Sequence, residues 1–182
     1  GKKKMVDDVD GIIFCAGVSP RRFPSDKIIG NCDIQDVEDK FRLFGELSSE
    51  FNLPDTYLIS DIDEAINIAS DSPEKNFILK PRHGSGGYGI QKLDMLIKDS
   101  NKSELSSHRQ KIDENEWIMQ EFIDGENISA SVLSTKTESH TILNSSQIIG
   151  NKSLGHIEPF GYCGNIVPYN GDKKISETAE KV

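Results

Sequence analysis

Hydrophobic positions along the chain change their spacing several times, and each change predicts a new element. Between residues 37 and 51 apolar side chains recur at steps of three and four, which predicts an amphipathic helix. Asp36 or Asp39 is expected to cap its start. Pro54 ends the pattern, because the residue before a proline is pushed out of the helical region. A second short helix is predicted over 61–70.

Short apolar runs between turn residues predict the strands. They are expected at 11–18, 56–60, 77–80, 89–93, 117–123, 128–134 and 140–150, the last with a bulge at Asn144. Residues 94–115 are polar and predict surface helix and loop, whereas residues 151–171 predict loop around a short strand. A helical pattern resumes at Lys173. The strands at 77–80 and 89–93 therefore enclose a glycine-rich segment as a hairpin.

Composition and charge narrow the class of protein. The 182 residues, 35% hydrophobic and 28% charged, fit one domain or one domain plus part of a second. No run of 18 apolar residues exists, so no membrane span is predicted. The net charge of −9 argues against a nucleic-acid partner, because phosphate contacts need clustered Lys and Arg. Cys15, Cys32 and Cys163 lack CxxC spacing, which predicts a reduced, cytoplasmic protein without a cysteine metal site.

The segment 77–90, FILKPRHGSGGYGI, contains a GxGxxG match at Gly84, Gly86 and Gly89, a weak motif on its own. In a dinucleotide-binding fold these glycines open a helix, whereas here a strand is expected downstream. In a protein kinase the phosphate-binding lysine comes later, and the accompanying HRD and DFG signatures are absent from this chain. Both of these nucleotide-binding folds are therefore disfavoured.

The remaining interpretation makes the lysine just before the loop part of a phosphate site. Lys80 ends an apolar strand, with Ile78 on the same face, and a cation in such a place requires an anion. Glycines let backbone N–H groups turn towards phosphate oxygens without side chains intervening. A flexible hairpin with a snorkelling lysine is the alternative.

Two ordered segments resemble the ATP-grasp superfamily. The lysine–proline pair with the GSGGYGI hairpin is similar to the family's phosphate loop, and IMQEFIDGENISASVL at 118–133 to its strand–hinge–strand segment. Weaker similarity extends over 39–59 and 160–168. The resemblance implies an α+β fold in which two subdomains with antiparallel sheets grip ATP. The expected division is a remnant of a preceding α/β domain with linker at 1–35, a first subdomain with the glycine-rich loop at 36–116, and an incomplete second subdomain at 117–182.

The resemblance also implies a chemistry. A carboxylate–amine ligase, of a type found in archaea and bacteria, activates a carboxylate as an acyl phosphate with ATP and Mg²⁺, and an amine attacks it. The implied partners are small-molecule carboxylate and amine substrates, with a homodimer left open. The family's magnesium ligands are expected downstream of Val182, so no metal ligand is assigned and the chain alone is expected to be inactive. The alternatives are a catalytically inactive nucleotide-binding regulatory module and a small structural domain.

The phosphate residues follow from the matching family positions. The resemblance implies that Lys40 and Lys80 reach the phosphates of ATP; the alternative for Lys40 is an ordinary surface lysine. The implied lid over the β- and γ-phosphates consists of Gly84, Ser85, Gly86, Gly87 and Gly89. Arg82 and His83 are candidates for a substrate carboxylate or the transferred phosphate, with simple exposure as the alternative.

The hinge residues are implied in the same way. Gln120 directs its side chain to the adenine amino group, the Glu121 carbonyl accepts from that group, and the Ile123 N–H donates to a ring nitrogen. Phe122 lies between them in the hinge. Glu126 matches the residue that accepts from the ribose hydroxyls, because a carboxylate can take two such bonds. A plain turn residue is the alternative for Glu126.

Overall fold

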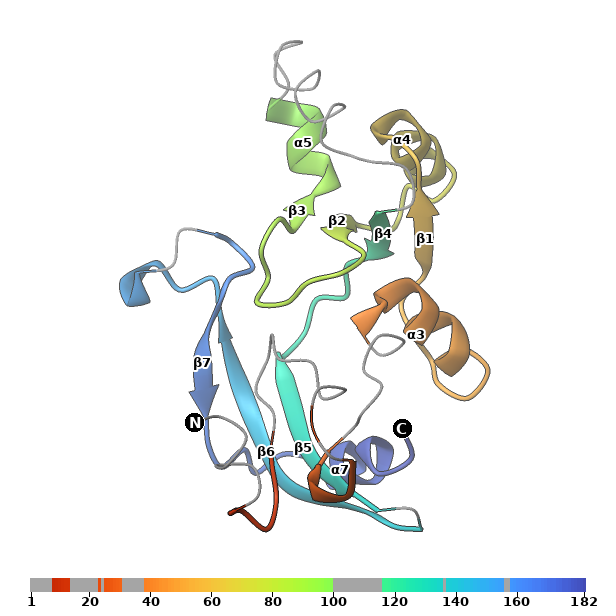
Figure 1. The fold of residues 1–182 in the computed structure, drawn as a ribbon. Coiled ribbons are helices and arrows are strands. Elements are labelled where there is room, and N and C mark those ends of the chain that lie inside the picture. Colours follow the sequence, from red (N-terminus) through yellow and green to blue (C-terminus); the bar gives the residue numbers. More distant parts are fainter. Residues whose placement is uncertain are drawn as a thin grey trace.

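The computed structural model describes residues 8–13, 23, 25–30, 38–99, 116–135, 137–155 and 158–182. Expectations for residues 14–18, for 36–37 and for 100–115 lie outside the described part of the chain. Two antiparallel sheets organise the fold, one of four strands in the order β1-β4-β2-β3 and one of three in the order β5-β6-β7 (Figure 1). The expected α+β class with two antiparallel sheets is confirmed.

The four-stranded sheet carries the lysine of the glycine-rich segment. Its strands are β1 (Thr56–Ile59), β2 (Phe77–Pro81), β3 (Gln91–Lys92) and β4 (Trp117–Glu121). The central pair aligns Ile78 with Gln120 and Lys80 with Ile118. On the other side of β4, Thr56 is aligned with Gln120. Because aligned residues and every second residue share a face, Lys80, Ile78, Gln120 and Thr56 point to the same side.

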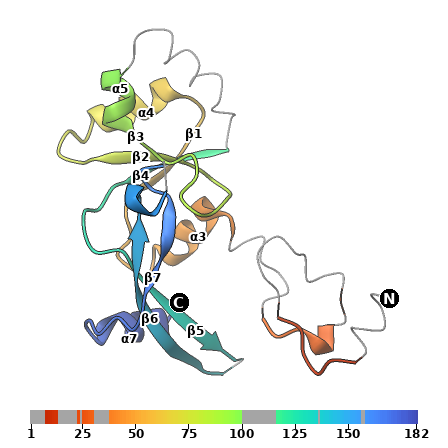
Figure 2. The same cartoon turned by 90° about the vertical axis from the view of Figure 1, so that its left-hand side faces the viewer.

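The opposite face of this sheet forms the hydrophobic core. It is covered by α4 (Ile62–Ser70) and α5 (Leu93–Asp99), which lie above β2 and β3 in Figure 2. Leu79 and Met119 are almost fully buried at its centre. The side chain of Asp61 caps α4 by accepting from the Glu64 N–H at 2.8 Å. Burial of this apolar face therefore fixes which side of β2 and β4 stays available for polar residues.

The lysine-bearing face is covered by α3 (Lys40–Leu47) instead. Asp39 is its N-cap and accepts from the Arg42 N–H at 3.2 Å, as one of the two expected caps. The helix stops at Leu47, short of the predicted end at residue 51. Ser48 donates its hydroxyl to the carbonyl of Gly45 at 2.8 Å, and such a side-chain bond competes with the helical one.

The second sheet consists of β5 (Ile128–Ser134), β6 (Ser139–Ile149) and β7 (Tyr162–Ile166), with α7 (Lys174–Ala179) packed on β5 and β6. The predicted bulge at Asn144 is wrong. Asn144 pairs with Ala130, and the register slips instead at Ile142, which lies between partners of Ser131 and Val132. The Asn144 amide donates to the Ser176 hydroxyl at 2.8 Å, so this residue ties α7 to β6.

Three further expectations are corrected. The strand predicted at 89–93 shrinks to the two residues of β3, because Leu93 begins α5 and is buried in the core. The strand predicted at 117–123 ends at Glu121. Near the N-terminus Ile12 forms only an isolated bridge with Ile28, and Ile13 is 75% exposed, so 11–13 is no buried strand. Two short 3₁₀ helices, η2 (Ser25–Lys27) and η3 (Lys152–Leu154), complete the described elements.

Candidate functional site

The glycine-rich loop between β2 and β3 reaches from the four-stranded sheet to the other sheet (Figure 1). Positive φ angles occur at Gly84 (111°), Gly86 (75°), Gly87 (79°) and Gly89 (73°). At Gly87 an added Cβ would lie 1.9 Å from the carbonyl oxygen of Phe160, so only glycine fits there. The Tyr162 N–H donates to the Gly86 carbonyl at 3.1 Å. The loop therefore lies against the segment that leads into β7 and is hydrogen-bonded to it.

Lys80 lies at the base of this loop, and its ammonium group has no anionic partner in the part of the chain that the structure describes. Its Nζ donates to the Gln120 Oε1 at 2.7 Å and lies 5.5 Å from the centroid of the Phe44 ring. Among the described residues no carboxylate is within salt-bridge distance of this ammonium group. Burial, together with the charge of Lys40, lowers the pKa of Lys80 to about 8. An anionic ligand would stabilise the charged form.

Gln120 is held in place from both ends of its amide. The carbonyl accepts from Lys80, and the amino group donates to the Thr56 hydroxyl at 2.8 Å. Only 5% of Gln120 is exposed. The three residues come from three adjacent strands, so the sheet register orients the lysine.

Lys40 connects α3 to the same loop. Its Nζ donates to the carbonyl oxygens of Gly84 at 2.6 Å and Arg82 at 3.3 Å. Burial lowers the pKa of Lys40, partly offset by the charge of Asp39. The sequence-predicted pair of lysines is thus brought to one place, with Lys40 against the loop and Lys80 beneath it.

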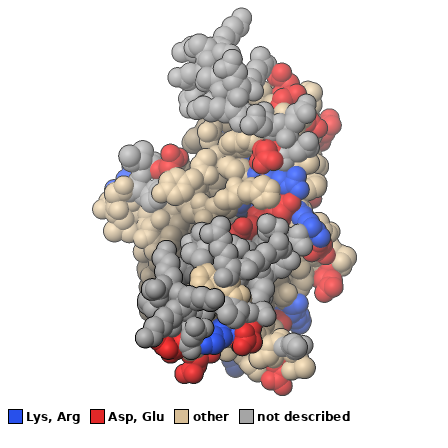
Figure 3. All heavy atoms as spheres, viewed as in Figure 1, with Lys and Arg blue, Asp and Glu red and all other residues tan. Residues whose placement is uncertain are grey.

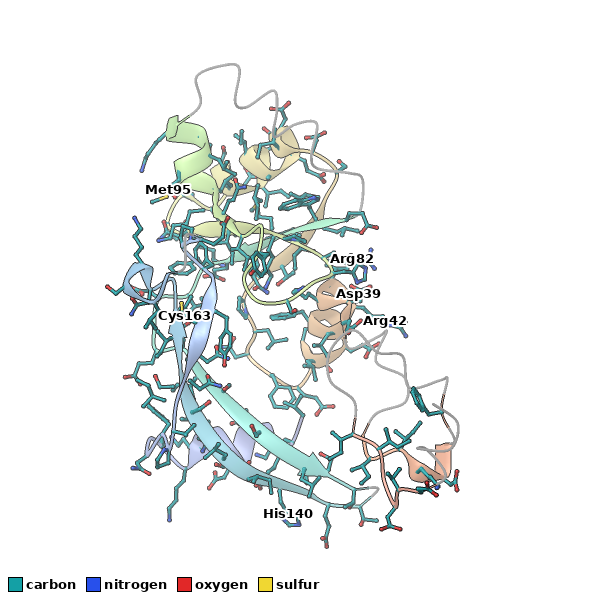
Figure 4. All side chains as sticks on the ribbon, turned by 60° about the vertical axis from the view of Figure 1, so that its left-hand side comes forward. Asp39, Arg42, Arg82, Met95, His140 and Cys163 are labelled. Carbon is teal, nitrogen blue, oxygen red and sulfur yellow. The ribbon has the colours of Figure 1, made fainter. Side chains whose placement is uncertain are left out.

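A salt bridge that the sequence did not reveal fixes the start of α3. Arg82 donates from Nε to Oδ1 of Asp39 at 2.8 Å and from the terminal nitrogen to Oδ2 at 2.5 Å (Figure 4). This guanidinium pairing lowers the pKa of Asp39 to about 2. Arg82, a candidate for a substrate carboxylate, therefore already has an internal partner. The two residues are 43 positions apart and no local motif links them.

The hinge after β4 leaves the N–H of Ile123 available as a donor among the described residues. The Glu121 N–H donates to the Asp55 carbonyl at 2.8 Å and the Phe122 N–H to the Asn76 carbonyl at 2.7 Å. Within the described residues the Ile123 N–H forms no hydrogen bond, and Ile123 is 61% exposed. The N–H groups of Glu121 and Phe122 are thus used within the fold. The N–H of Ile123, which the family resemblance implies as a donor to adenine, has no partner among the described residues.

Side chains of the hinge divide between two faces. The Glu121 carboxylate accepts from Lys75 at 3.3 Å, at the end of β4. The Phe122 ring lies edge-on to Phe160, with centroids 6.0 Å apart, and the Lys92 ammonium is 4.6 Å from its centroid. Phe122 therefore joins the hinge to the segment that also receives the glycine-rich loop.

A cavity of about 740 Å³ opens beside this hinge. Its wall includes Phe122 and Ile123, together with apolar side chains of α4, α5 and the segment 158–160. Neither Lys40 nor Lys80 lines it. The residues predicted from the sequence thus form two groups, the lysines with the glycine-rich loop and the hinge. The cavity is lined by residues of the hinge.

Glu126 precedes β5 on the second sheet. Its Oε2 accepts from the hydroxyl of Tyr169 at 2.6 Å, a contact that the sequence gave no means to find. Ser85 and His83 are exposed at the glycine-rich loop.

No cluster of metal-ligating side chains is found in the described part of the chain. Among the residues described, no group of three or more His, Cys, Asp or Glu could hold a metal ion. On the face seen in Figure 3, Lys and Arg side chains lie next to Asp and Glu. No helix within the described ranges has the length and apolar character needed to cross a membrane.

Several solved structures resemble this fold. VanG D-Ala:D-Ser ligase from Enterococcus faecalis has a TM-score of 0.60 at 16% identity, over 88% of this chain and 46% of that one. N5-carboxyaminoimidazole synthetase from Staphylococcus aureus gives 0.58 at 16% identity, over 88% and 39%. Carboxyaminoimidazole ribonucleotide synthase from Aspergillus clavatus, complexed with ATP, gives 0.59 at 11% identity, over 85% and 38%. These likenesses show the fold, and the chain spans less than half the length of each.

The family assignment rests on a separate comparison. Curated proteins gave no match. A family model described as an ATP-grasp domain matches residues 37–182, which include both sheets and the glycine-rich loop. This chain belongs to the ATP-grasp domain family.

Proposed function

We propose that the chain binds ATP between its two sheets and serves an ATP-dependent ligase that joins a carboxylate to an amine. The observation that carries this proposal is the environment of Lys80. Among the described residues this partly buried ammonium group has only neutral partners, and it lies beneath a loop of positive-φ glycines. Nucleotide phosphates would supply the missing charge.

The phosphate end of the proposed site consists of the two lysines and the loop. Lys80 binds phosphate oxygens from the sheet. Lys40 reaches them by moving its Nζ from the Gly84 carbonyl, which it now contacts at 2.6 Å. The backbone N–H groups of Gly84, Ser85, Gly86, Gly87 and Gly89 cover the phosphates. The Arg82–Asp39 pair keeps the start of α3 against the base of the loop.

The adenine end of the proposed site is the hinge. The Ile123 N–H, which has no partner within the described residues, donates to a ring nitrogen, and the Glu121 carbonyl accepts from the amino group. The Gln120 side chain lies beside the base, held by Lys80 and Thr56. Glu126 accepts from the ribose hydroxyls.

The proposed reaction has two steps. The substrate carboxylate attacks the γ-phosphorus of ATP, which gives an acyl phosphate and ADP. The amine then attacks the acyl carbon, and inorganic phosphate leaves as the amide forms. Because the described residues hold no ligand set for Mg²⁺, we assign no step to the ion. Support for the ligase class comes from the family and from a similar structure named as a D-Ala:D-Ser ligase.

The division of the chain is part of the proposal. Residues 36–116 and 117–182 remain the expected subdomains, after 1–35. If the subdomains are divided by sheets, the boundary between them moves from residue 116 to the residue after Glu121, because β4 pairs with β1 and β2.

Two measurements test the proposed function. Thermal unfolding followed with increasing ATP should show a rising midpoint, because a ligand of the native state stabilises it. An unchanged midpoint at millimolar ATP would favour a structural domain. Formation of ADP with a panel of carboxylates and amines, measured on the full-length protein, separates the ligase from a nucleotide-binding regulatory module. ATP binding without ADP formation would favour the module.

A further inference from the structure

Glu126 has one hydrogen-bond partner for its carboxylate within the described residues, and this is a tyrosine hydroxyl. Tyr169 donates to Oε2 at 2.6 Å from a loop 43 residues later. The carboxylate in turn raises the pKa of Tyr169. The contact links the turn before β5 to the loop between β7 and α7.

The position of Tyr169 is fixed by its surroundings. Its N–H donates to the carbonyl of Asn144 on β6 at 2.9 Å, and Asn144 is tied to Ser176 of α7. The phenol ring lies directly over Gly171. A Cβ added at Gly171 would be 2.0 Å from Cε1 of the ring and 2.8 Å from the hydroxyl. The ring therefore reaches Glu126 because residue 171 has no side chain.

This arrangement bears on how a carboxylate binds a diol. A glutamate on an exposed turn populates many rotamers, and ordering it upon binding weakens affinity. The hydrogen bond from the Tyr169 hydroxyl to Oε2 restricts the rotamers of Glu126 before a ligand binds. Oε1 and the second lone pair of Oε2 stay available to accept from two neighbouring hydroxyls. The 2′- and 3′-hydroxyls of a ribose are such a pair.

We propose that Tyr169 is a positioning residue that orients Glu126 towards the ribose, so that the pair makes the site selective for ribonucleotides over deoxyribonucleotides. This inference rests on the proposed function. The competing explanation is a purely structural link between β5 and the 167–173 loop.

Affinities for ATP and 2′-deoxyATP, measured by equilibrium binding on this chain, distinguish the two. Tyr169→Phe removes only the hydroxyl, and Gly171→Ala displaces the ring by a different route. Glu126→Gln weakens the acceptor. Tyr57→Phe is the matched control, because its ring packs against Phe77 away from the site.

We expect the unsubstituted chain to prefer ATP over 2′-deoxyATP by about ten-fold, the effect of losing a hydrogen bond to a charged group. Tyr169→Phe and Gly171→Ala should each reduce this preference by about three-fold or more, mainly through weaker ATP binding. In the Glu126→Gln background Tyr169→Phe should have little further effect. Tyr57→Phe should retain the preference.

A different pattern overturns the inference. If Tyr169→Phe and Gly171→Ala lower the unfolding temperature but keep the ratio of the two affinities, the contact is structural, and the proposed function still stands. If the unsubstituted chain binds neither nucleotide, the proposed function itself fails and this inference fails with it.

Discussion

The ammonium group of Lys40 donates to the carbonyl oxygen of Gly84 at 2.6 Å and so joins the first residue of α3 to the glycine-rich loop. The loop is fastened at its other side by the bond from the Tyr162 N–H to the Gly86 carbonyl. Lys80 lies beneath it, bonded to Gln120. The two lysines implied by the family resemblance thus both lie at one loop. Lys40 tethers it, and Lys80 has no anionic partner among the described residues.

Replacing Lys40 should loosen the loop and weaken nucleotide binding together. In Lys40→Met the tether to Gly84 is lost, and hydrogen exchange at residues 84–89 should become faster. ATP affinity should fall by about ten-fold, since one charge-assisted contact is removed. Lys98→Met is the matched control, because its ammonium group bonds to Asp94 on an exposed turn of α5, away from the glycine-rich loop. Unchanged exchange in Lys40→Met would rule out the tether.

The pKa of Lys80 predicts how ATP binding depends on pH. Burial lowers this pKa to about 8, so the free amine loses its charge above that value, whereas bound phosphate favours the charged form. Affinity should therefore decline above about pH 8, by at most about ten-fold per pH unit. The measurement is a series of dissociation constants between pH 7.5 and 9.5. Lys80→Arg keeps its charge and should give a flat profile.

The same pKa predicts a change in stability. Between the folded pKa of Lys80, about 8, and its ordinary value of 10.5, the unfolded state binds more protons than the folded state. The contribution of Lys80 to stability should therefore rise with pH across this window. A lysine whose pKa is raised by a partner would show the opposite trend. Urea unfolding of the unsubstituted chain and of Lys80→Met would show a difference that shrinks as pH rises. A constant difference would contradict the lowered pKa.

The Asp39–Arg82 pair predicts sensitivity to acid. The folded pKa of Asp39 is about 2, below the ordinary value of 3.8, so the stabilisation from its ion pair is present above pH 4 and is lost as pH falls towards 2. Asp39→Asn should cost about 1 to 2 kcal/mol at pH 7, because asparagine keeps the helix cap and loses the ion pair. The measurement is the free energy of unfolding of both proteins at pH 7 and pH 3, and the difference between them should be smaller at pH 3. Equal differences at both pH values would exclude this role.

Two glycines offer a test of the closed loop. Gly87 has a φ of 79° and no room for a Cβ beside Phe160, so Gly87→Ala should release the loop from the second sheet and weaken ATP binding. Gly45 lies within α3 with nothing near its missing Cβ. Gly45→Ala should stabilise the fold by about 0.5 to 1 kcal/mol and leave ATP affinity unchanged. If Gly87→Ala bound ATP as tightly as Gly45→Ala, the loop contact would be irrelevant to binding.

The local sequence pattern was enough to predict where Lys80 lies in the fold. Lys80 before a run of glycines is visible in fourteen residues, and the strand register then confirmed that it shares a face with Ile78. Leu93 was predicted to end a strand, but it is the first residue of α5 and is buried in the core with the side chains of β2. Its burial is decided by the packing of α5 against β2 and not by alternation with its neighbours.

Contacts between segments far apart in the chain could not be predicted from the sequence. Arg82 and Asp39 are 43 residues apart, as are Tyr169 and Glu126, and neither pair has a spacing that signals contact. The register slip at Ile142 was missed for a different reason. Ile142 is 66% exposed, so no core requirement marks its position, and the polar Asn144 attracted the prediction instead.

The central claim is that Lys80 holds the phosphates of ATP, and calorimetric titration of this chain with ATP tests it most directly. The unsubstituted chain and Lys98→Met should bind with the same dissociation constant, and Lys80→Met should bind at least about ten-fold more weakly at pH 7.5. Thermal unfolding of Lys80→Met without nucleotide serves as the check that the variant is folded. Equal affinity of Lys80→Met and the unsubstituted chain would contradict the account.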